Sequence, residues 1–93
     1  MALLNEQEIN SKLEELNGWS YENNSIHKEY KKSNFTNALG FVTMIGVEAE
    51  KMDHHPDILM YGWNKVKITI STHSEGGVTE KDIKLAQTIE KLY

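Results

Sequence analysis

Histidine is scarce in this chain, yet two of its four histidines are adjacent and precede its only proline, in His54-His55-Pro56. Imidazole can donate and accept a proton near neutral pH, which makes it the usual side chain for acid–base catalysis. A proline also forces the residue before it out of helical geometry. We therefore expect a helix to end just before the pair, leaving the two imidazoles pointing in different directions.

Three further polar residues can join the pair. Glu50 precedes His54 by four positions in a predicted helix, so the two should project from the same side of it. His73 lies at the end of a predicted strand, and Asp82 lies in the first turn of the last predicted helix. Because all these groups come from the ends of elements, they can converge on one pocket. Three imidazoles with two carboxylates would suit general acid–base chemistry.

Each residue also has a purely structural interpretation. Asp82 is explained by its place at the third position of a helix, where an acid favours the helix dipole. Glu50 and the imidazoles of His54, His55 and His73 can be solvated surface groups. Spacing alone does not show that they meet, but their joint occurrence favours chemistry.

Other chemistries fit the sequence less well. His54, His55, His73 and a carboxylate would suit zinc by ligand type. Adjacent residues of an extended backbone point in opposite directions, however, and the spacing His-x-x-x-His is absent, so we expect no metal. The chain has no cysteine, no Gly-x-Ser-x-Gly and no glycine-rich phosphate loop, which leaves no recognisable nucleophile or dinucleotide site.

The apolar periodicity predicts an α+β domain. Its elements follow the order α-β-β-α-β-β-α, and the short connections favour a four-stranded antiparallel sheet with three helices on one face. The other sheet face should be open and polar. The predicted helices cover Leu4–Asn17, Ser33 or Asn34 to Asp53, and Thr79 onward; the predicted strands are a hairpin over residues 19–30 that turns at Asn23-Asn24, then Ile58–Tyr61 and Trp63–Ser74.

The second predicted helix is apolar over more of its surface than one packing face requires, from Phe35 to Met52. Gly40 and Gly46 lower its helix propensity and suggest the close approach of another backbone. A single domain of 93 residues has a small core. These features favour a helix that packs on its own sheet and also on a partner subunit.

Composition excludes several classes of protein. The net charge of −4 and the absence of a basic tract argue against direct nucleic-acid binding. No run approaches the roughly 18 apolar residues of a membrane span, and the first residues do not form a signal peptide. We expect a cytoplasmic protein with one domain over residues 1–93.

The same residues carry a resemblance to a known family. Glu50 is followed after three residues by His54-His55-Pro56, and Trp63, His73 and Asp82 follow at intervals of six, nine and eight residues. This ordered set, with the stretches AEKMDHHPD, NKVKITISTH and TEKDIKLA, resembles the pterin-4a-carbinolamine dehydratases over almost the whole chain.

The resemblance implies an activity and a site. Members dehydrate the 4a-hydroxytetrahydropterin left by aromatic amino-acid hydroxylases, with the pterin as substrate and no further cofactor. It implies that His54, His55 and His73 are the catalytic residues and that Glu50 and Asp82 support them. Pro56 and Trp63 would belong to the substrate-binding region.

The resemblance also implies self-association, as dimers through the sheets and as tetramers through the second helix. The residues are also compatible with two other functions. The domain can be a non-catalytic binding or dimerisation module that uses its apolar second helix, or a relative that acts on another pterin.

Overall fold

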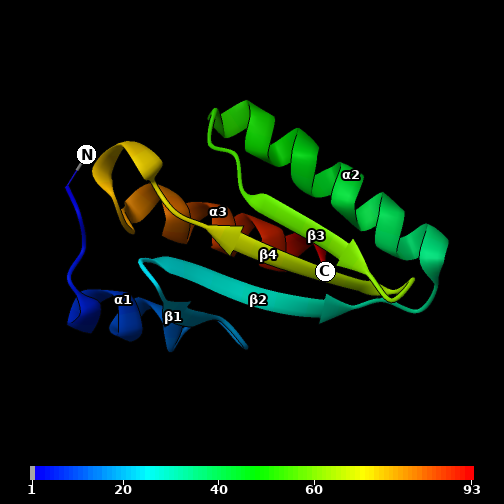
Figure 1. Cartoon of the computed structure of the whole chain (residues 1–93), viewed down its shortest axis with the longest axis horizontal. Helices are drawn as coiled ribbons and strands as arrows, with labels where there is room; N and C mark the ends of the chain where they lie inside the picture. The colour runs from blue at the N-terminus through cyan, green and yellow to red at the C-terminus, as the bar shows by residue number, and fades with distance from the viewer. Residues whose placement is uncertain (1) are drawn as a thin grey trace.

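The computed structural model describes residues 2–93, and its elements follow the predicted order (Figure 1). A short 3-10 helix, η1, is the one element that the periodicity did not predict. The elements are α1 (Glu6–Leu13), β1 (Ser20–Glu22), β2 (Ser25–Lys31), α2 (Phe35–Met52), β3 (Asp57–Tyr61), β4 (Lys65–Ile70), η1 (His73–Glu75) and α3 (Glu80–Leu92).

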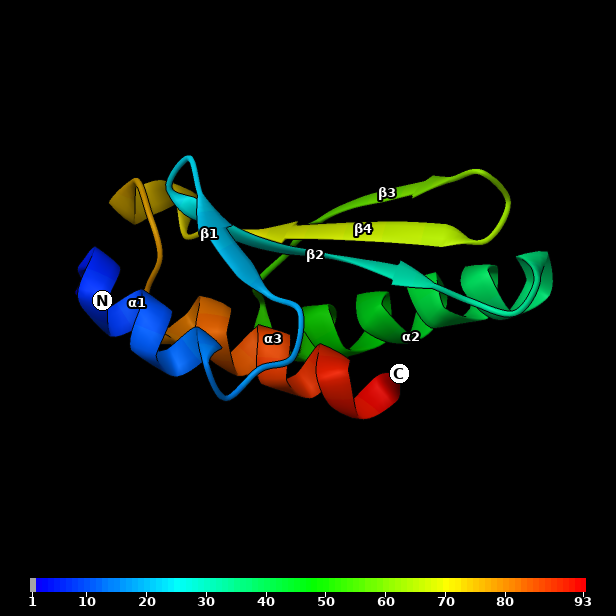
Figure 2. The ribbon, with the colours of Figure 1, turned by 90° about the horizontal axis from the view of Figure 1, so that it is seen from below.

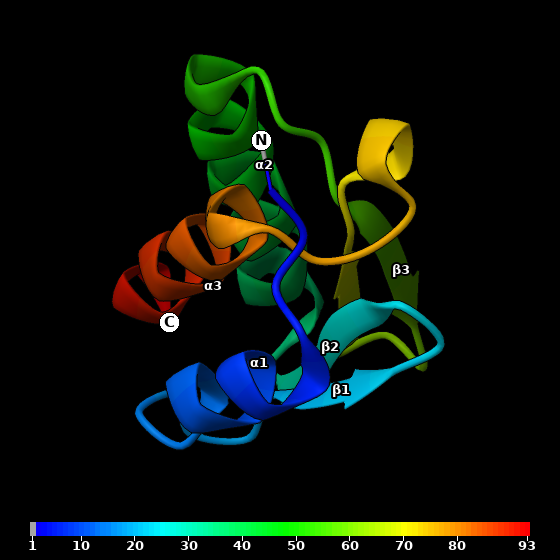
Figure 3. The same ribbon diagram turned by 90° about the vertical axis from the view of Figure 1, so that its left-hand side faces the viewer.

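The four strands form one antiparallel sheet in the order β1-β2-β4-β3, and the three helices cover one of its faces (Figure 2). An end-on view separates the layer of α1, α2 and α3 from the sheet, and these three helices all lie on one side of it (Figure 3). The predicted α+β architecture is therefore confirmed. Within residues 2–93, none of the helices combines the length and the apolar character needed to cross a bilayer.

The core lies between the sheet and the helices. In β4 the alternate residues Val66, Ile68 and Ile70 are fully buried, whereas the residues between them face outward. Burying an aliphatic side chain of this size stabilises the fold by about 1.5–3 kcal/mol. Because the side-chain period of a strand is two, this pattern fixes the register of β4 and thereby the position at which the strand ends.

The first helix and the hairpin agree with the sequence in most respects. The capping box of Asn5 and Glu8 is present, and Asn23 and Asn24 turn the hairpin with positive φ angles of 52° and 60°. However, α1 ends at Leu13 rather than at Asn17. The next two residues are glutamates, which the negative end of the helix dipole disfavours.

The predicted strand over Trp63–Ser74 is too long at both ends. Trp63 has a φ of 58° and lies in the turn that joins β3 to β4. At the other end β4 stops at Ile70, and His73 is the first residue of η1 rather than the end of a strand. Thr72 keeps the alternation of β4, lies on the core side and is buried.

A buried polar cluster surrounds Glu90 near the C-terminal end of α3. Its Oε1 accepts hydrogen bonds from Trp19 Nε1 at 3.1 Å, from Lys28 Nζ at 2.6 Å and from Tyr30 Oη at 2.5 Å. Burial and the bond to Glu90 raise the pKa of Tyr30. Burial alone would raise the pKa of Glu90, but its hydrogen bonds outweigh burial and hold this pKa below its ordinary value of 4.5.

The second helix buries one side and leaves large apolar residues on the other. Ala38, Phe41, Ile45 and Ala49 are buried against the core. Gly40 and Gly46 both lie on open surface, because a Cβ added to either would meet no atom within 4 Å. The approach of another backbone that these glycines suggested does not occur within residues 2–93. The exposed apolar residues, each 44–56% exposed, are Phe35, Leu39, Met44 and Val47.

Candidate acid–base site

A cavity of about 270 Å³ lies where α2 and β4 end and α3 begins. These three ends lie toward the same end of the molecule in Figure 1. All three predicted catalytic imidazoles line it. We call it the imidazole cavity; its lining residues are Asp53, His54, His55, Ser71, Thr72, His73, Ser74 and Lys81.

The two adjacent histidines diverge because the chain reverses just before them. Asp53 caps α2 in the left-handed conformation, with φ 49° and ψ 44°, and Pro56 keeps the backbone of His55 extended. His54 turns inward and is only 9% exposed, whereas the side chain of His55 is 60% exposed. The predicted divergence of the imidazoles is confirmed.

His54 is held by a fully buried carboxylate. Its Nε2 lies 2.5 Å from Oδ1 of Asp82, and Oδ2 of Asp82 accepts hydrogen bonds from Thr79 N at 2.8 Å and from Thr72 Oγ1 at 2.7 Å. Because both oxygens of Asp82 act as acceptors, His54 carries a proton on Nε2. The bond from Thr79 N also belongs to the capping box of α3, so one side chain both starts the helix and orients the imidazole.

His55 has a carboxylate partner of a different kind. Its Nε2 lies 2.8 Å from Oε1 of Glu50, and both side chains are exposed. The sequence predicted that Glu50 shares a helix side with His54. That prediction is wrong because α2 ends at Met52 and the left-handed cap carries His54 away from the helix surface.

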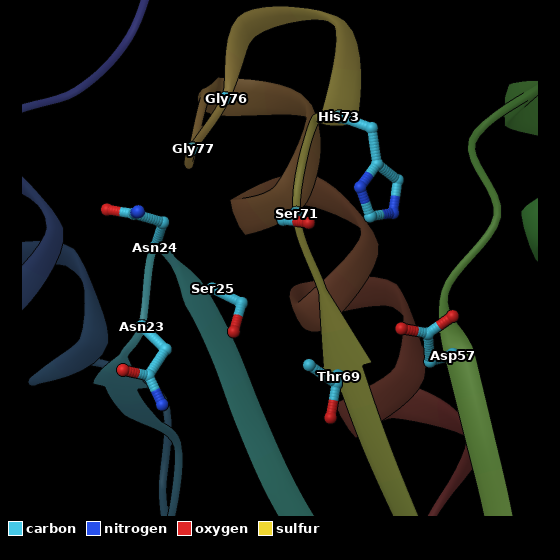
Figure 4. Close-up of a pocket in the computed structure, with 9 residues that line it drawn as sticks. All are labelled: Asn23, Asn24, Ser25, Asp57, Thr69, Ser71, His73, Gly76 and Gly77. Atoms are coloured by element: carbon cyan, nitrogen blue, oxygen red, sulfur yellow. The ribbon is translucent and has the colours of Figure 1, made fainter.

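His73 stands between two cavities. It follows Thr72, the N-cap residue of η1, and lines the imidazole cavity as well as a second cavity of about 320 Å³. Figure 4 shows its ring projecting from the end of β4 over the gap toward Asp57. Its ring nitrogens have no hydrogen-bond partner within the described chain. The ring is therefore free to meet a ligand from either cavity.

The two predicted substrate-binding residues lie in different places. Pro56 directly follows the histidine pair and is half-buried. Trp63 is 61% exposed in the β3–β4 turn, at the far end of β3 from the imidazole cavity. A strand of five residues spans roughly 16 Å, so Trp63 does not reach the imidazoles of its own chain.

Five lining residues were not predicted as site residues, and two of them, Thr72 and Lys81, show what the sequence could and could not reveal. Thr72 is a polar residue on the buried face of the β4 extension, and such a hydroxyl needs a partner, which here is Asp82. A polar residue at a buried position of the strand pattern could therefore have indicated that Thr72 belongs to the site. Lys81 lines the cavity from the first turn of α3, where nothing in its spacing distinguished it from a solvated lysine.

The arrangement suits proton transfer on a small molecule. It combines one imidazole fixed by a buried carboxylate, one paired with an exposed carboxylate, and one without a partner. Such different environments favour different protonation roles for chemically identical groups. No group of three or more His, Asp or Glu side chains in residues 2–93 has the geometry of a metal site.

Comparison with known proteins assigns this α+β layer and its histidine-lined end to a family. The family model "Pterin 4 alpha carbinolamine dehydratase" matches residues 2–92. A Sulfolobus acidocaldarius protein provisionally named pterin-4-alpha-carbinolamine dehydratase is 52% identical over 96% of this chain and 97% of its own. A provisionally named Prochlorococcus marinus protein is 42% identical over 99% and 96%. The chain belongs to the pterin-4-alpha-carbinolamine dehydratase family, as the spaced histidines predicted.

Solved structures agree with this assignment. A "transcriptional coactivator/pterin dehydratase" from Brucella melitensis has a TM-score of 0.93 and 39% identity, with 98% of each chain covered. A pterin dehydratase-like protein identified as a RuBisCO assembly factor in the α-carboxysome has a TM-score of 0.67, with 83% of this chain and 90% of its own covered. Its identity of 18% makes it a likeness of fold alone.

Proposed function

We propose that the protein dehydrates 4a-hydroxytetrahydropterin, the 4a-carbinolamine, to quinonoid dihydropterin and water by general acid–base catalysis. The observation that carries the proposal is the convergence of His54, His55 and His73 on one cavity, with Asp82 and Glu50 behind the first two. Membership of the family supports the same reaction.

The reaction requires two proton transfers on neighbouring atoms. The C4a–O bond breaks with its electron pair on oxygen, which takes a proton and leaves as water. N5 loses its proton, and the N5–H bonding pair becomes available to the ring as the C4a=N5 bond forms. Imidazole groups on two sides of this bond can supply both transfers, so we propose no metal and no cofactor besides the pterin substrate.

We assign the two protons to His55 and His73 and the orientation of the pterin to His54. The buried bond to Asp82 fixes the ring of His54 and occupies its Nε2, which suits positioning. His55 and His73 are exposed and can exchange protons with solvent. Positioned acid–base groups contribute about 10²–10⁴-fold in rate, which is sufficient for a carbinolamine that already dehydrates readily.

Regeneration of the pterin used by aromatic amino-acid hydroxylases would be the role of this reaction, in the cytoplasm. We also propose that the protein self-associates, because a core of this size gains stability from a partner. We propose dimers that form through the sheets, or tetramers that in addition bury the exposed apolar residues of α2. Leu39→Glu, at a position that is 50% exposed, should reduce the molar mass in solution without unfolding the chain.

A non-catalytic binding module is the second candidate, and the same exposed side of α2 favours it. In that case the histidines would be incidental and α2 would bind another protein. The two candidates differ in what a loss of histidine does, because only the enzyme needs the imidazoles.

A stopped-flow assay tests the proposed function. The 4a-hydroxytetrahydropterin is generated in place, and its dehydration is followed with and without the protein in the presence of a chelator. We expect an acceleration that survives the chelator and is lost in His55→Ala and His73→Ala. A folded protein that gives no acceleration would contradict the proposal and would direct attention to α2.

A further inference from the structure

Trp63 combines two properties that the stability of the fold does not explain. Its backbone is left-handed, with a φ of 58°, at a turn position that usually takes glycine or asparagine. Its indole is 61% exposed, and within residues 2–93 it makes no hydrogen bond and no aromatic contact. A strained residue with a mostly exposed aromatic side chain indicates binding rather than packing.

β3, which leads into this turn, is an edge strand without the usual protection against pairing. The strand order β1-β2-β4-β3 leaves one side of its backbone without a neighbour (Figure 1). Edge strands are commonly short or carry lysine, proline or a bulge. The five residues of β3 include no lysine or proline, and they pair with β4 one for one, without a bulge. The other edge strand, β1, has only three residues and packs beside α1.

The side chains of β3 indicate that a further strand would fit beside it. Leu59 is exposed, and Ile58 and Met60, which face the helices, are only half-buried. In β4, which has a neighbour on each side, the alternate residues that face the helices are fully buried. A second strand beside β3 would cover apolar side chains that the chain alone leaves accessible to water.

The sequence of β3 suits an antiparallel copy of itself. All five residues pair in one register, which places Leu59 on the two-fold axis and Asp57 opposite the partner's Tyr61. No like charges face each other, because Asp57 is the only charged residue of the strand. Each step past Tyr61 in one chain is a step before Asp57 in the other. Trp63 therefore lies beside the partner's His55.

This neighbour would supply what the imidazole cavity lacks. Small-molecule sites usually enclose about 300–1,000 Å³ and are lined mainly by apolar and aromatic side chains. The imidazole cavity encloses about 270 Å³, and among residues 2–93 no Phe, Tyr or Trp lines it. The side chain of His55 is 60% exposed at this cavity, so one side of its ring is open to a residue of another chain.

The expected separation suits a bound heterocycle. Neighbouring strands lie about 4.8 Å apart, and the β3–β4 turn displaces Trp63 by up to one further spacing, so its Cα would lie roughly 10 Å from the partner's backbone. A flat ring fits between an indole and an imidazole at that separation. In the same chain, by contrast, Trp63 and His55 are at opposite ends of β3.

We propose that the protein forms a two-fold dimer through β3, in which Trp63 of each subunit completes the imidazole cavity of the other as an aromatic wall for the pterin ring. The identity of the ligand rests on the proposed function. Without ligand the indole stays in contact with water, and it gains a stacking partner only when the flat ring binds. Trp63 therefore binds the substrate and takes no part in proton transfer.

The first test removes the wall. Trp63→Ala should lower kcat/KM about ten- to a hundredfold, chiefly through KM, because a stacked heterocycle loses its aromatic neighbour. Phe35→Ala is the matched control, since Phe35 is an aromatic residue of similar exposure on α2 and its loss should leave kcat/KM unchanged. Titration calorimetry with a tetrahydropterin that lacks the 4a hydroxyl measures the same difference as binding, independently of turnover.

The second test removes the dimer. Leu59→Lys places two lysines opposite each other on the two-fold axis. It is made in the Leu39→Glu background, so that α2 does not hold the chains together. Leu39→Glu alone should remain a dimer with unchanged affinity for the tetrahydropterin. Adding Leu59→Lys should give single chains by sedimentation, with the affinity of Trp63→Ala, and Trp63→Ala should then cause no further loss.

The third test shows on which subunit Trp63 acts. Chains with Trp63→Ala keep their imidazoles, and chains with both His55→Ala and His73→Ala keep Trp63. When equal amounts are refolded together, half of the dimers are mixed and each mixed dimer has one complete site, so about a quarter of the wild-type kcat/KM should return. If Trp63 served its own chain, the mixture would only average the two variants.

Three outcomes would overturn the inference: unchanged affinity and KM in Trp63→Ala, a mixture no more active than the average of its components, or single chains that bind the tetrahydropterin as well as the dimer does. A wild type that binds this pterin through Trp63 but does not accelerate dehydration would contradict the proposed function alone, and the shared site would stand.

Discussion

Two histidine–carboxylate pairs lie a few residues apart in this molecule, and they differ in almost every physical respect except chemistry. The pair of His54 and Asp82 is buried, joins residues 28 positions apart and ties three elements together. The pair of His55 and Glu50 is exposed and joins residues five positions apart across the end of α2.

The difference shows how burial divides the work of similar groups. A buried charged group is costly unless its partners satisfy it, and breaking such a pair costs several kcal/mol. An exposed pair is screened by water and salt and contributes little to folding. We therefore interpret the first pair as a rigid group that would orient the pterin. We interpret the second pair as a group that would transfer a proton without disturbing the fold.

The largest expected effect distinguishes the two imidazoles in catalysis. His55→Ala should lower kcat about 10²–10⁴-fold, because it removes a group assigned to proton transfer. His54→Ala should mainly raise KM, because it removes the group that we propose orients the pterin. Stopped-flow kinetics measures both, with circular dichroism to confirm the fold. If His54→Ala lost as much kcat as His55→Ala without weaker binding, the division of roles would be incorrect.

The next effect distinguishes the two carboxylates in stability. Asp82→Asn should lower the free energy of unfolding by about 3 kcal/mol, because the amide cannot accept all the hydrogen bonds that Asp82 receives. Glu50→Gln should change it by less than about 0.5 kcal/mol, since both members of its pair are exposed. Urea denaturation at neutral pH compares them, and similar losses in both variants would refute the contrast.

A smaller effect extends the comparison to a third carboxylate, Glu90. Its pKa is lowered in the folded state, so it stabilises the protein above the pKa of the unfolded chain, near 4.5, and loses that contribution as the pH falls through its folded pKa. Glu90→Gln should be less stable than the wild type by about 2 kcal/mol at pH 7.

Urea titrations from pH 7 to pH 3 measure this dependence. The difference in the free energy of unfolding between the wild type and Glu90→Gln should begin to decrease near pH 4.5 and decrease further below it, because the protonated Glu90 resembles the amide. A gap that stayed constant over this range would mean that the charge of Glu90 does not matter. Glu50→Gln serves as the control, since both members of its pair are exposed and contribute little to the free energy of unfolding.

The sequence predicted most of the fold because local signals and apolar periodicity agree in it. Capping boxes at Asn5 and Thr79 begin α1 and α3 close to the predicted starts, and the predicted Asn23-Asn24 turn joins the hairpin. The errors occur where tertiary contacts decide the boundary. Trp63 has strand propensity, but the β3–β4 connection requires it to adopt a turn conformation.

The site was only partly predictable, for a related reason. The spaced set contains the three imidazoles that line one cavity, and the proline explained why two of them diverge. The partner of His54 did not follow from spacing, because Asp82 reaches it from another element and is separated by 28 residues. Glu50 pairs with His55 rather than with His54 because one residue, Asp53, is left-handed. Apolar periodicity does not reveal such a residue.

The positions of the two tryptophans give the protein an internal spectroscopic contrast. Trp19 is 6% exposed and donates to Glu90, whereas Trp63 is 61% exposed in a turn far from the imidazole cavity. Unfolding moves the indole of Trp19 from a buried site into water and barely changes the surroundings of Trp63. A shift in tryptophan fluorescence therefore reports the packing around Glu90, and Trp63→Phe would leave Trp19 as the only tryptophan.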